Sequence, residues 1–321
     1  MIHFYSDLFN LVQALADGDE DAMIQLDRYG LLAAPGEDNT ACATRIKSWL
    51  EADSNLLMDI KCGHSVELDP GIKVTKNDVI ASEVREPAAA KCRELYGFSV
   101  DWAPGFFLRS GVGLLWGGCA WHDEKSNITV FALRNSFRTS ANYLVYNRDE
   151  LIAHESCHAA RSPFGNDWQL EEFFAYQTST NPFRRYIGNC FVLKSDAILF
   201  LAPAFIVLLQ QIIKSFYVPS FPWWPAWIIF ATAIGYLLGR NQFARNNFFR
   251  AGKNLKKFYN ISGKDANCFL FRCTWQEIKT IAGISGKDSC NKYLLAPETC
   301  DLRRKTAIKR FVPELMEVYD A

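Results

Sequence analysis

The chain has 321 residues, and its 35 Lys and Arg residues balance its 35 Asp and Glu residues, which gives a formal net charge of zero. A chain of this length can bury a large core and forms one large domain or two smaller ones. The charge balance supplies no overall field that attracts nucleic acid, so no nucleic-acid partner is expected.

The ten cysteines are scattered, with no C-x-x-C pair and no histidines at zinc-finger spacing. A chain this long does not depend on disulfides for stability, so the pattern favours free thiols in a reducing compartment. The start of the chain, MIHFYSDLFNLVQALADGDED, lacks the basic segment and the long apolar run of a signal peptide. We therefore expect no secretion signal.

The N-terminal region is expected to be helical. Apolar residues at helical spacing predict helices over residues 3–16, 20–32 and 41–52. Residues 56–80 are expected to form short extended pieces around an Asp69-Pro70-Gly71 turn, followed by a helix over 81–97 that Pro87 interrupts. We interpret residues 1–97 as a lobe for packing or interaction rather than for chemistry.

The composition changes between residues 98 and 146. The segments FFLRSGVGLLWGGCAWH and NITVFALRNSF are rich in Val, Ile, Leu and aromatic residues, with turn residues between them, which predicts antiparallel strands. His122 falls in the expected turn and is interpreted as a surface residue. His3 and His64 have no partner at metal-binding spacing and are interpreted in the same way.

Residues 154–158 form the pattern H-E-x-x-H. Two histidines at i and i+4 lie on one face of a helix, close enough for both imidazoles to bind one metal ion, with Glu155 beside it. Asn147 is expected to cap this helix, and Ser162-Pro163 to end it. The rest of the helix is mostly apolar, with Cys157 expected in the core. Two histidines and a glutamate without partners would be costly to bury in such a helix. A zinc ion bound by the histidines would give them a partner.

A third metal ligand is expected from the next helix, capped by Asn166 or Asp167 and ended at Asn181-Pro182. The short turn makes the two helices antiparallel, so a carboxylate early in the second helix can face His158. Glu171 and Glu172 point about 100° apart on a helix, so only one of them can easily be a ligand. The spacing does not decide which of the two glutamates is the third ligand.

The pairing of H-E-x-x-H with a glutamate on a following helix resembles the gluzincin zinc metallopeptidases. Residues 172–176, Glu-Phe-Phe-Ala-Tyr, are also similar to the E-x-x-A-D segment of their membrane-embedded branch, the CAAX-protease and HtpX-like heat-shock enzymes. That alignment selects Glu172 as the ligand and leaves Glu171 in a supporting or surface position. Tyr176 stands where that branch has aspartate. The resemblance covers about thirty residues.

The resemblance implies a zinc-dependent peptidase that acts on a protein or peptide substrate. Its zinc ligands would be His154, His158 and Glu172, and Glu155 would act as general base towards a zinc-activated water. The candidates for an oxyanion donor are Tyr176, Arg161 and Arg184. Residues 127–135 are expected to be an edge strand with which the substrate pairs.

Two long apolar runs follow, at residues 197–216 and 221–239, each near the ~20 residues that cross a bilayer. Three tryptophans at one end of the second run are typical of a membrane interface, and basic residues flank the pair. We expect a two-pass transmembrane hairpin over residues 195–240, in contact with lipid through residues 197–239, with both flanks in the cytoplasm. The alternative is two buried helices of a soluble core.

The C-terminal region is expected to be helical. Thr274 and Glu277 form a capping box at the start of a helix that Gly283 ends. The basic stretch 302–311 is interpreted as a solvated helix face, with contact to anionic lipid headgroups as the alternative.

The expected fold is α+β, mainly helical, with a small antiparallel sheet next to the H-E-x-x-H helix and a transmembrane helical hairpin. Its expected parts are an N-terminal lobe (1–97), a metallopeptidase-like core (98–190), the hairpin (195–240) and a cytoplasmic C-terminal region (241–321). The expected function is that of a membrane-anchored zinc metallopeptidase whose catalytic domain faces the cytoplasm. A non-catalytic membrane adaptor with the same fold, or an amidase with a non-protein substrate, stays open.

Overall fold

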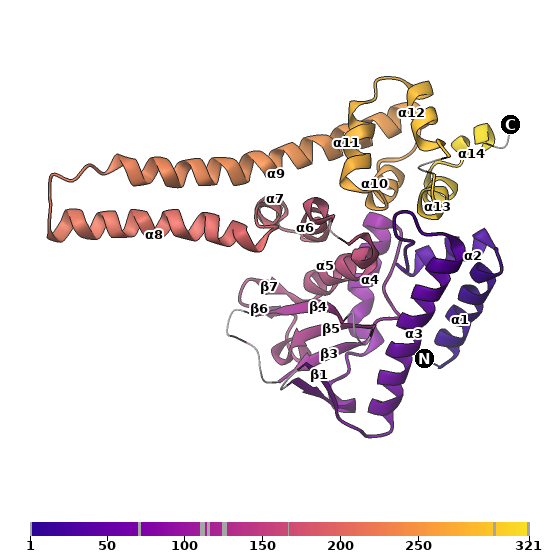
Figure 1. The fold of residues 1–321 in the computed structure, drawn as a ribbon. Coiled ribbons are helices and arrows are strands. Elements are labelled where there is room, and N and C mark those ends of the chain that lie inside the picture. Colours follow the sequence, from indigo (N-terminus) through magenta and orange to yellow (C-terminus); the bar gives the residue numbers. More distant parts are fainter. Residues whose placement is uncertain are drawn as a thin grey trace.

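The computed structural model of the chain describes residues 2–69, 72–109, 113, 116–123, 127–165, 167–297 and 300–319. Helices make up most of this part, and its strands form three small sheets. The expectation of a mainly helical chain with small sheets is therefore confirmed. Figure 1 shows a body of helices and strands from which two helices, α8 (Lys194–Phe216) and α9 (Trp224–Tyr259), project side by side.

The first part of the chain is helical, as predicted. Its helices are α1 (Ile2–Ala16), α2 (Glu20–Arg28), α3 (Asn39–Lys61) and α4 (Ser82–Tyr96). α3 runs nine residues past the predicted end at residue 52, because Leu56, Leu57 and Ile60 continue its buried face. The extended pieces expected from residue 56 start only at Val66. The predicted interruption at Pro87 is also wrong, since α4 continues through it.

The main sheet contains β3 (Gly105–Leu108), β4 (Gly118–Asp123) and β5 (Ile128–Arg134), in the order β3-β5-β4. β4 pairs antiparallel with β5, as predicted, but β3 pairs parallel with it. The sheet is therefore mixed, which corrects the expected antiparallel sheet. Residues 127–135, expected at an edge, form the centre of the sheet, and β4 is the edge strand on the side of the H-E-x-x-H helix.

β5 occupies the centre because it pairs with β3 on one side and with β4 on the other, and both of its faces are buried. Phe131 and Leu133 belong to the main apolar core, together with residues of α5 (Arg148–Arg161). Val130 and Ala132, on the other face, pack in a second cluster with Ile60 of α3. The alternating residues of β5 therefore enter two cores, one on each face of the sheet.

Two small hairpins accompany the sheet, one of β1 (Val66–Asp69) and β2 (Ile72–Val74), the other of β6 (Asn142–Tyr143) and β7 (Tyr146–Asn147). The turn expected at Asp69-Pro70-Gly71 falls between β1 and β2 in the sequence, and Pro70 and Gly71 lie outside the described residues. Residues 124–126, between β4 and β5, also lie outside them. The 3-10 helices are Lys76–Asp78, Asn135–Arg138, Ser162–Phe164 and Gly188–Cys190, the last of which is labelled η4.

α5 is followed by α6 (Trp168–Tyr176) and α7 (Pro182–Ile187), and then by the projecting pair. α8 and α9 pack against each other. Among the described residues, one helical segment is long and apolar enough to cross a membrane, Ser195–Phe216, with a mean hydropathy of 2.0 and 17% of it buried. The apolar part of α9 ends at Arg240. At 1.5 Å per residue it is about 24 Å long, shorter than the ~30 Å of a bilayer core.

The surface of the projecting pair, which we call the helical hairpin (residues 194–240), is strongly apolar. Exposed apolar side chains include Ile198, Leu201, Phe205, Leu208, Ile228 and Ile229. Trp223 and Trp224 lie exposed where α9 begins, at the tip of the hairpin. At its base, Asp196 and Arg240 form an ion pair of 2.6 Å that ties α8 to α9. The hairpin therefore has an aromatic tip, an apolar shaft and a charged clamp.

The C-terminal helices pack back onto the body. They are α10 (Gly263–Phe271), α11 (Trp275–Gly283), α12 (Lys287–Leu294), α13 (Leu302–Phe311) and α14 (Glu314–Tyr319). The predicted capping box of Thr274 and Glu277 is confirmed. The basic stretch 302–311 is not a fully solvated face, because Arg303 and Arg304 of α13 are buried with Glu277.

The regions expected as separate parts share one apolar core. It contains, among others, Leu8 of α1, Phe174 of α6 and Phe271 of α10. The expected boundary at residue 240 also falls inside α9. The N-terminal, central and C-terminal regions are thus one body, and the hairpin is the part that leaves it.

Candidate metal centre

The H-E-x-x-H helix, α5, begins and ends where the sequence predicts. The Asn147 side chain accepts hydrogen bonds from the backbone N–H groups of Asp149 at 3.0 Å and Glu150 at 3.1 Å, which caps the helix. α5 ends at Arg161, and Gly165 completes the turn with φ at +60°, a conformation that glycine adopts without strain.

The start of α6 is held differently from the prediction. Asp167 occupies the cap position, but its side chain makes no capping hydrogen bond. Its carboxylate accepts instead from Arg161 Nη2 at 2.8 Å and from the backbone N–H of Trp275 at 3.0 Å. Asn166, the alternative cap, lies outside the described residues. α6 therefore starts from a contact with the C-terminal region rather than from a local cap.

The structure brings His154, His158 and Glu172 together. His154 Nε2 lies 3.2 Å from His158 Nε2. His154 Nε2 is 3.6 Å from Glu172 Oε2, and His158 Nε2 is 3.6 Å from Glu172 Oε1. One donor atom from each residue can be chosen so that all three lie within 4.8 Å of one another. We call these three residues the cleft cluster.

These separations suit a tetrahedral metal ion. Bonds of about 2.0–2.1 Å to zinc in that geometry place two ligand atoms about 3.3 Å apart. A hydrogen shared between the two imidazoles would also explain the 3.2 Å contact, but not why each of the two nitrogens has an oxygen of Glu172 at 3.6 Å. Two imidazoles and one carboxylate are three ligands of a catalytic zinc site, which keeps a fourth position for water.

The two histidines have different surroundings. Burial, helped by the neighbouring positive charges, lowers the pKa of His154 to about 3, although its ring also hydrogen-bonds to the backbone of Ala175. Burial also disfavours the charged form of His158, but the carboxylates of Glu171, Glu172 and Glu155 outweigh it and raise its pKa to about 9. His154 is thus neutral at pH 7, and a metal ion at His158 would replace a proton.

Glu155 lies close enough to His158 and Glu172 to feel their charges, and it also bonds to the edge strand. Its Oε2 accepts a hydrogen bond of 2.6 Å from the backbone N–H of Ala120 in β4. Burial raises the pKa of Glu155 to about 7, while the charge of His158 and the bond from Ala120 act in the opposite direction. A carboxyl group with a pKa near neutrality can both accept and release a proton.

Glu171 supports the site from the side. Its Oε2 lies 3.7 Å from His158 Nδ1, the ring nitrogen that faces away from Glu172. Its Oε1 accepts from Arg161 Nε at 2.8 Å. A carboxylate behind a ligand histidine fixes the orientation of the ring. This is the supporting position that the family resemblance implied for Glu171.

Arg161 is buried and holds several groups at once. Besides Asp167 and Glu171, its guanidinium donates to the backbone carbonyls of Phe271 and Cys273. Because these acceptors turn it away from the cleft, Arg161 is not an oxyanion donor in this structure. Its long-range partners gave no signal in the sequence.

Tyr176 covers the outer side of His154. The two rings meet edge to face, with their centroids 4.7 Å apart. A Cβ atom on Gly188 would lie 2.2 Å from Cγ of Tyr176, so only glycine allows η4 to pass this close to the ring. Burial raises the pKa of Tyr176, with a further contribution from Glu172. The phenol is therefore protonated at neutral pH and able to donate a hydrogen bond.

A cleft of about 190 Å³ opens beside His154 and Glu155. Its other lining residues are Gly118, Tyr146, Glu150, Leu151, Tyr176, Thr178, Ser179 and Arg184. Among these residues, only Tyr176 and Arg184 are predicted from the sequence to have a role in the cleft. Glu150, four residues before His154 and so on the same helix face, could have been identified from its spacing.

Glu150 and Arg184 face each other in this cleft. Glu150 Oε2 lies 3.6 Å from Arg184 Nη1 and also accepts from Ser179 Oγ at 2.9 Å. Arg184 donates in addition to the carbonyl of Val145 at 3.1 Å. Of the two arginines considered as oxyanion donors, Arg184 is the one that lines the cleft.

The remaining histidines and Cys157 lie elsewhere. Cys157 is buried in the core, as predicted. His122 belongs to β4, opposite Thr129, rather than to a turn, although its side chain is outside the described part. His64 is exposed near Asp59, and the side chain of His3 is not described.

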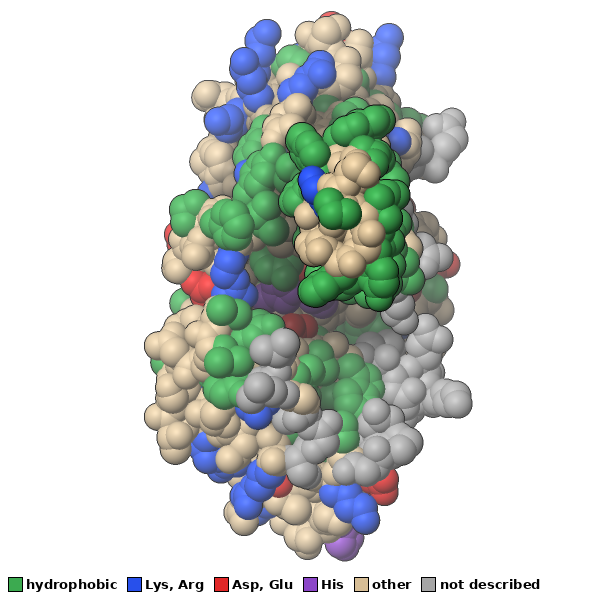
Figure 2. Space-filling view, turned by 90° about the vertical axis from the view of Figure 1, so that its left-hand side faces the viewer, with side chains coloured by type: hydrophobic (Ala, Val, Ile, Leu, Met, Phe, Trp, Pro, Cys, Tyr) green, Lys and Arg blue, Asp and Glu red, His purple; other side chains and the backbone are tan. Residues whose placement is uncertain are grey.

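Figure 2 views the molecule from the tip of the hairpin. Histidine and acidic side chains lie at the bottom of a hollow beneath the hairpin, between it and the sheet-containing part of the body. The hollow opens on the side from which α8 and α9 project.

Comparison of the chain with protein-family models, with curated proteins and with solved structures finds no match. The interpretation of this site therefore depends on its motif and its geometry.

Proposed function

We propose that the chain is a membrane-anchored zinc metallopeptidase. His154, His158 and Glu172 are its zinc ligands, and Glu155 is its general base. The observation that carries the proposal is the convergence of three side chains from α5 and α6, with donor atoms 3.2–3.6 Å apart, next to a buried carboxyl group. The resemblance to gluzincins supports the same assignment.

Zinc bound by these residues would supply a positive charge that polarises a water molecule and the substrate carbonyl. The bond from Ala120 fixes one oxygen of Glu155 and leaves the other to take the proton of the attacking water. Glu155 then passes this proton to the leaving amine. Tyr176 or Arg184, which line the cleft, stabilises the developing oxyanion by donating a hydrogen bond.

The substrate in this proposal is a protein or peptide in extended form. The edge strand β4 provides backbone groups for pairing, and Ala120 in that strand holds Glu155. An extended segment beside β4 would therefore pass the general base. Pairing with the substrate is therefore proposed for β4 and not for residues 127–135, which lie in the centre of the sheet.

The helical hairpin anchors the enzyme as a two-pass segment, with the catalytic body on the cytoplasmic side. The exposed apolar shaft and the tryptophans at the tip support insertion, and basic residues near its base support a cytoplasmic location for the body. α8 is long enough to span a bilayer. α9 has a shorter apolar part, so its insertion requires local thinning of the bilayer or tilting of the pair.

Metal analysis of the purified chain tests the ligand set. We expect one zinc per chain in the wild type and in His64→Ala, a control that removes an exposed histidine. His154→Ala and His158→Ala should lose the metal. Wild-type protein that takes up no zinc would end the proposal for hydrolysis and would leave the alternative of a non-catalytic membrane adaptor.

Glu155→Gln tests catalysis separately from metal binding. Cleavage of an unfolded protein or a peptide library should fall by about 10²–10⁴-fold, the usual contribution of a general base, while zinc content stays at one per chain. Equal cleavage by the variant and the wild type would show that the measured activity does not come from this site.

Topology is tested by membrane extraction and by labelling of cysteines in intact cells. The full chain should resist alkaline extraction, and a chain in which a short Gly-Ser linker replaces residues 195–239 should not. Labelling of the exposed Cys62 by an impermeant reagent from outside the cell would contradict the cytoplasmic location of the body.

A further inference from the structure

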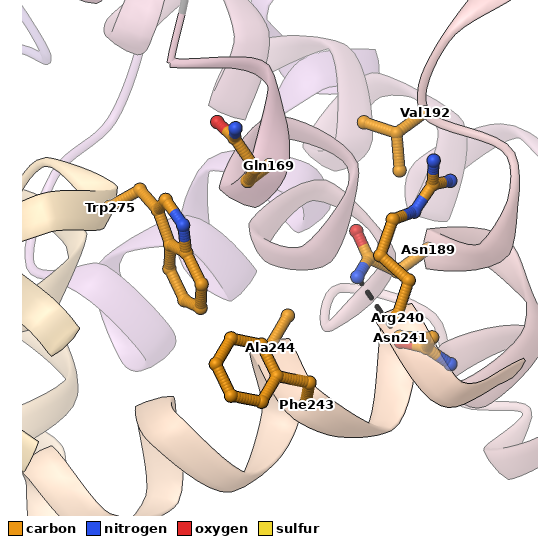
Figure 3. A pocket seen from close by; sticks show the side chains of 8 residues that line it. All are labelled: Gln169, Asn189, Val192, Arg240, Asn241, Phe243, Ala244 and Trp275. Atoms are coloured by element: carbon orange, nitrogen blue, oxygen red, sulfur yellow. Dashed lines mark hydrogen bonds between the residues drawn. The ribbon is translucent and has the colours of Figure 1, made fainter. Parts of the chain in front are cut away.

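A second cavity, of about 200 Å³, lies between α6, η4, α9 and α11 and shares no residue with the cleft. Figure 3 shows the eight side chains that line it. Val192, Phe243, Ala244 and Trp275 give it apolar walls, while Gln169 and Asn189 contribute amide groups. At ~30 Å³ for each water-sized group, it has room for about six or seven such groups.

One polar atom in the wall of this cavity has no partner. Asn189 is buried, with 2% of its surface exposed, and its Oδ1 accepts no hydrogen bond within the described part of the chain. In Figure 3 this oxygen is turned away from Asn241 and towards the space that the eight side chains line. An unpaired buried acceptor is unfavourable, so the site is suited to a ligand that donates a hydrogen bond there.

The orientation of the Asn189 amide is fixed by its neighbours. Asn241 Nδ2 donates to the carbonyl of Tyr186 at 2.7 Å, so the Oδ1 of Asn241 is its acceptor side. Asn189 Nδ2 donates to that oxygen at 3.1 Å. Exchanging the nitrogen and oxygen of Asn189 would bring two acceptors together, which excludes the flipped amide.

The charge in the cavity is already balanced. Arg240 donates to both carboxylate oxygens of Asp196, at 2.9 and 2.6 Å, and to the carbonyl of Cys190 at 2.9 Å. An anionic ligand would have to compete with Asp196 for this guanidinium. The cavity therefore favours an uncharged donor over a carboxylate or a phosphate.

The place of the cavity indicates where its ligand comes from. Arg240 is the first charged residue of α9, and the cavity begins at this residue and continues through Ala244. If the apolar shaft lies in a bilayer, the cavity is at the level of the lipid headgroups. It is thus continuous with the surface that lipid would cover.

We propose that this cavity binds the uncharged headgroup of a neutral membrane lipid of the monoacylglycerol or diacylglycerol class. A glycerol hydroxyl donates to Asn189 Oδ1, and the acyl chain leaves along the apolar shaft of the hairpin. This inference depends on the proposed anchoring by the hairpin but not on hydrolysis at the zinc site.

Photo-crosslinking tests the proposal on the purified full chain in detergent micelles. The probe is a monoacylglycerol with a diazirine on the acyl chain close to the ester, and labelled residues are located by mass spectrometry. We expect labelling at Phe243 or Trp275 that unlabelled monooleoylglycerol displaces. The matching free fatty acid, which carries the same diazirine but a carboxylate head, should label these residues about tenfold less.

Two variants on α9 separate the cavity from general contact with the hairpin. Ala244→Phe fills the cavity from a buried position and should reduce labelling about tenfold. Asn246→Phe adds the same ring at an exposed position two residues away and should keep wild-type labelling. Undiminished labelling in Ala244→Phe, or equal labelling by the fatty acid, would overturn the proposal.

If Ala244→Phe does not fold, displacement in the wild type decides the question. Labelling that excess monooleoylglycerol does not reduce, or labels confined to residues 198–230, would show only nonspecific contact of the probe with the shaft and would overturn the proposal. Alkaline extraction tests separately whether the hairpin anchors the chain in a membrane. The crosslinking in micelles does not depend on that result.

Discussion

Two neighbouring groups of charged side chains meet at α5 and α6. They differ in whether their charges are paired within the protein. The cleft cluster of His154, His158 and Glu172 directs three lone-pair donors at one point. The second group, the arginine cluster, contains Arg161, Arg303 and Arg304 together with Asp167, Glu171 and Glu277. In it, every arginine contacts a carboxylate at hydrogen-bond distance.

The difference separates a binding site from a structural network. Buried charges that are paired and hydrogen-bonded within the protein need nothing from outside. Among the described residues, no Lys or Arg forms an ion pair with Glu172, whose contacts are the two histidines. Converging donors of this kind suit a cation, whereas the arginine cluster holds α5, α6, α11 and α13 together.

Arg161→Met should have the largest effect, because it removes the guanidinium that pairs with two carboxylates of the arginine cluster. Asp167 and Glu171 would remain as carboxylates without their guanidinium, and two backbone carbonyls would lose their donor. We expect a loss of about 3–5 kcal/mol in the free energy of unfolding, measured by denaturant titration. Arg250→Met, at an exposed position of α9, is the control and should change little. A loss below about 1 kcal/mol would contradict the structural role.

Glu172→Gln tests the cleft cluster with a change of one atom. It removes the charge of the third ligand, and zinc affinity should fall by about 4 kcal/mol, one third of a typical binding free energy. Competition with a chelator measures this. The unfolding free energy of the metal-free chain should not decrease, since burial raises the pKa of Glu172 and so already disfavours its charged form. Unchanged zinc affinity would move the third ligand elsewhere.

Glu277→Gln tests the other end of the arginine cluster and its pH dependence. Burial raises the pKa of Glu277, but Arg303 and Arg304 outweigh it and hold the pKa at about 2. This value lies below the ~4.3 of an unfolded chain, so the interaction stabilises fully above that pH and is lost as the pH falls towards 2.

We expect Glu277→Gln to cost about 3 kcal/mol at pH 7 and clearly less at pH 3. Denaturant titrations of both proteins at the two pH values measure the difference. A cost that does not change between pH 7 and pH 3 would assign the effect to packing rather than to charge.

Glu171→Gln should give the smallest effect, a loss of zinc affinity. Glu171 belongs to the arginine cluster and also touches the cleft cluster. Glu171 contacts both Arg161 and the far side of the His158 ring. Loss of a carboxylate behind a ligand histidine lowers metal affinity by about 10–100-fold, less than loss of a ligand. The same chelator competition compares it with Glu172→Gln. A larger effect for Glu171 than for Glu172 would reverse the two assignments.

Local signals in the sequence predicted the centre of the site. The Asn147 cap, the i, i+4 histidines and the turn at Pro163 and Gly165 depend on neighbouring residues, and each appears in the structure. The position of Glu172 beside the histidines came from the family resemblance, because spacing alone did not choose between it and Glu171.

Long-range partners were not predictable in the same way. The second face of β5 is buried because α3 and β2, from the N-terminal region, cover it. Arg161 and Arg303 are buried because their acceptors come from distant segments. Periodicity marks basic residues as surface, and only the completed packing shows that these are enclosed.

The contacts of Arg161 also set a time order for assembly. Its acceptors on Phe271 and Cys273 lie 110 and 112 residues further along the chain, beyond the whole hairpin. At a synthesis rate of about 5–20 residues per second, α5 emerges roughly 5–20 seconds before they do. During that interval Glu171, and through it His158, lacks its final support. The last contacts of Arg161 therefore form only after the hairpin has left the ribosome, so completion of the candidate site follows synthesis of the hairpin.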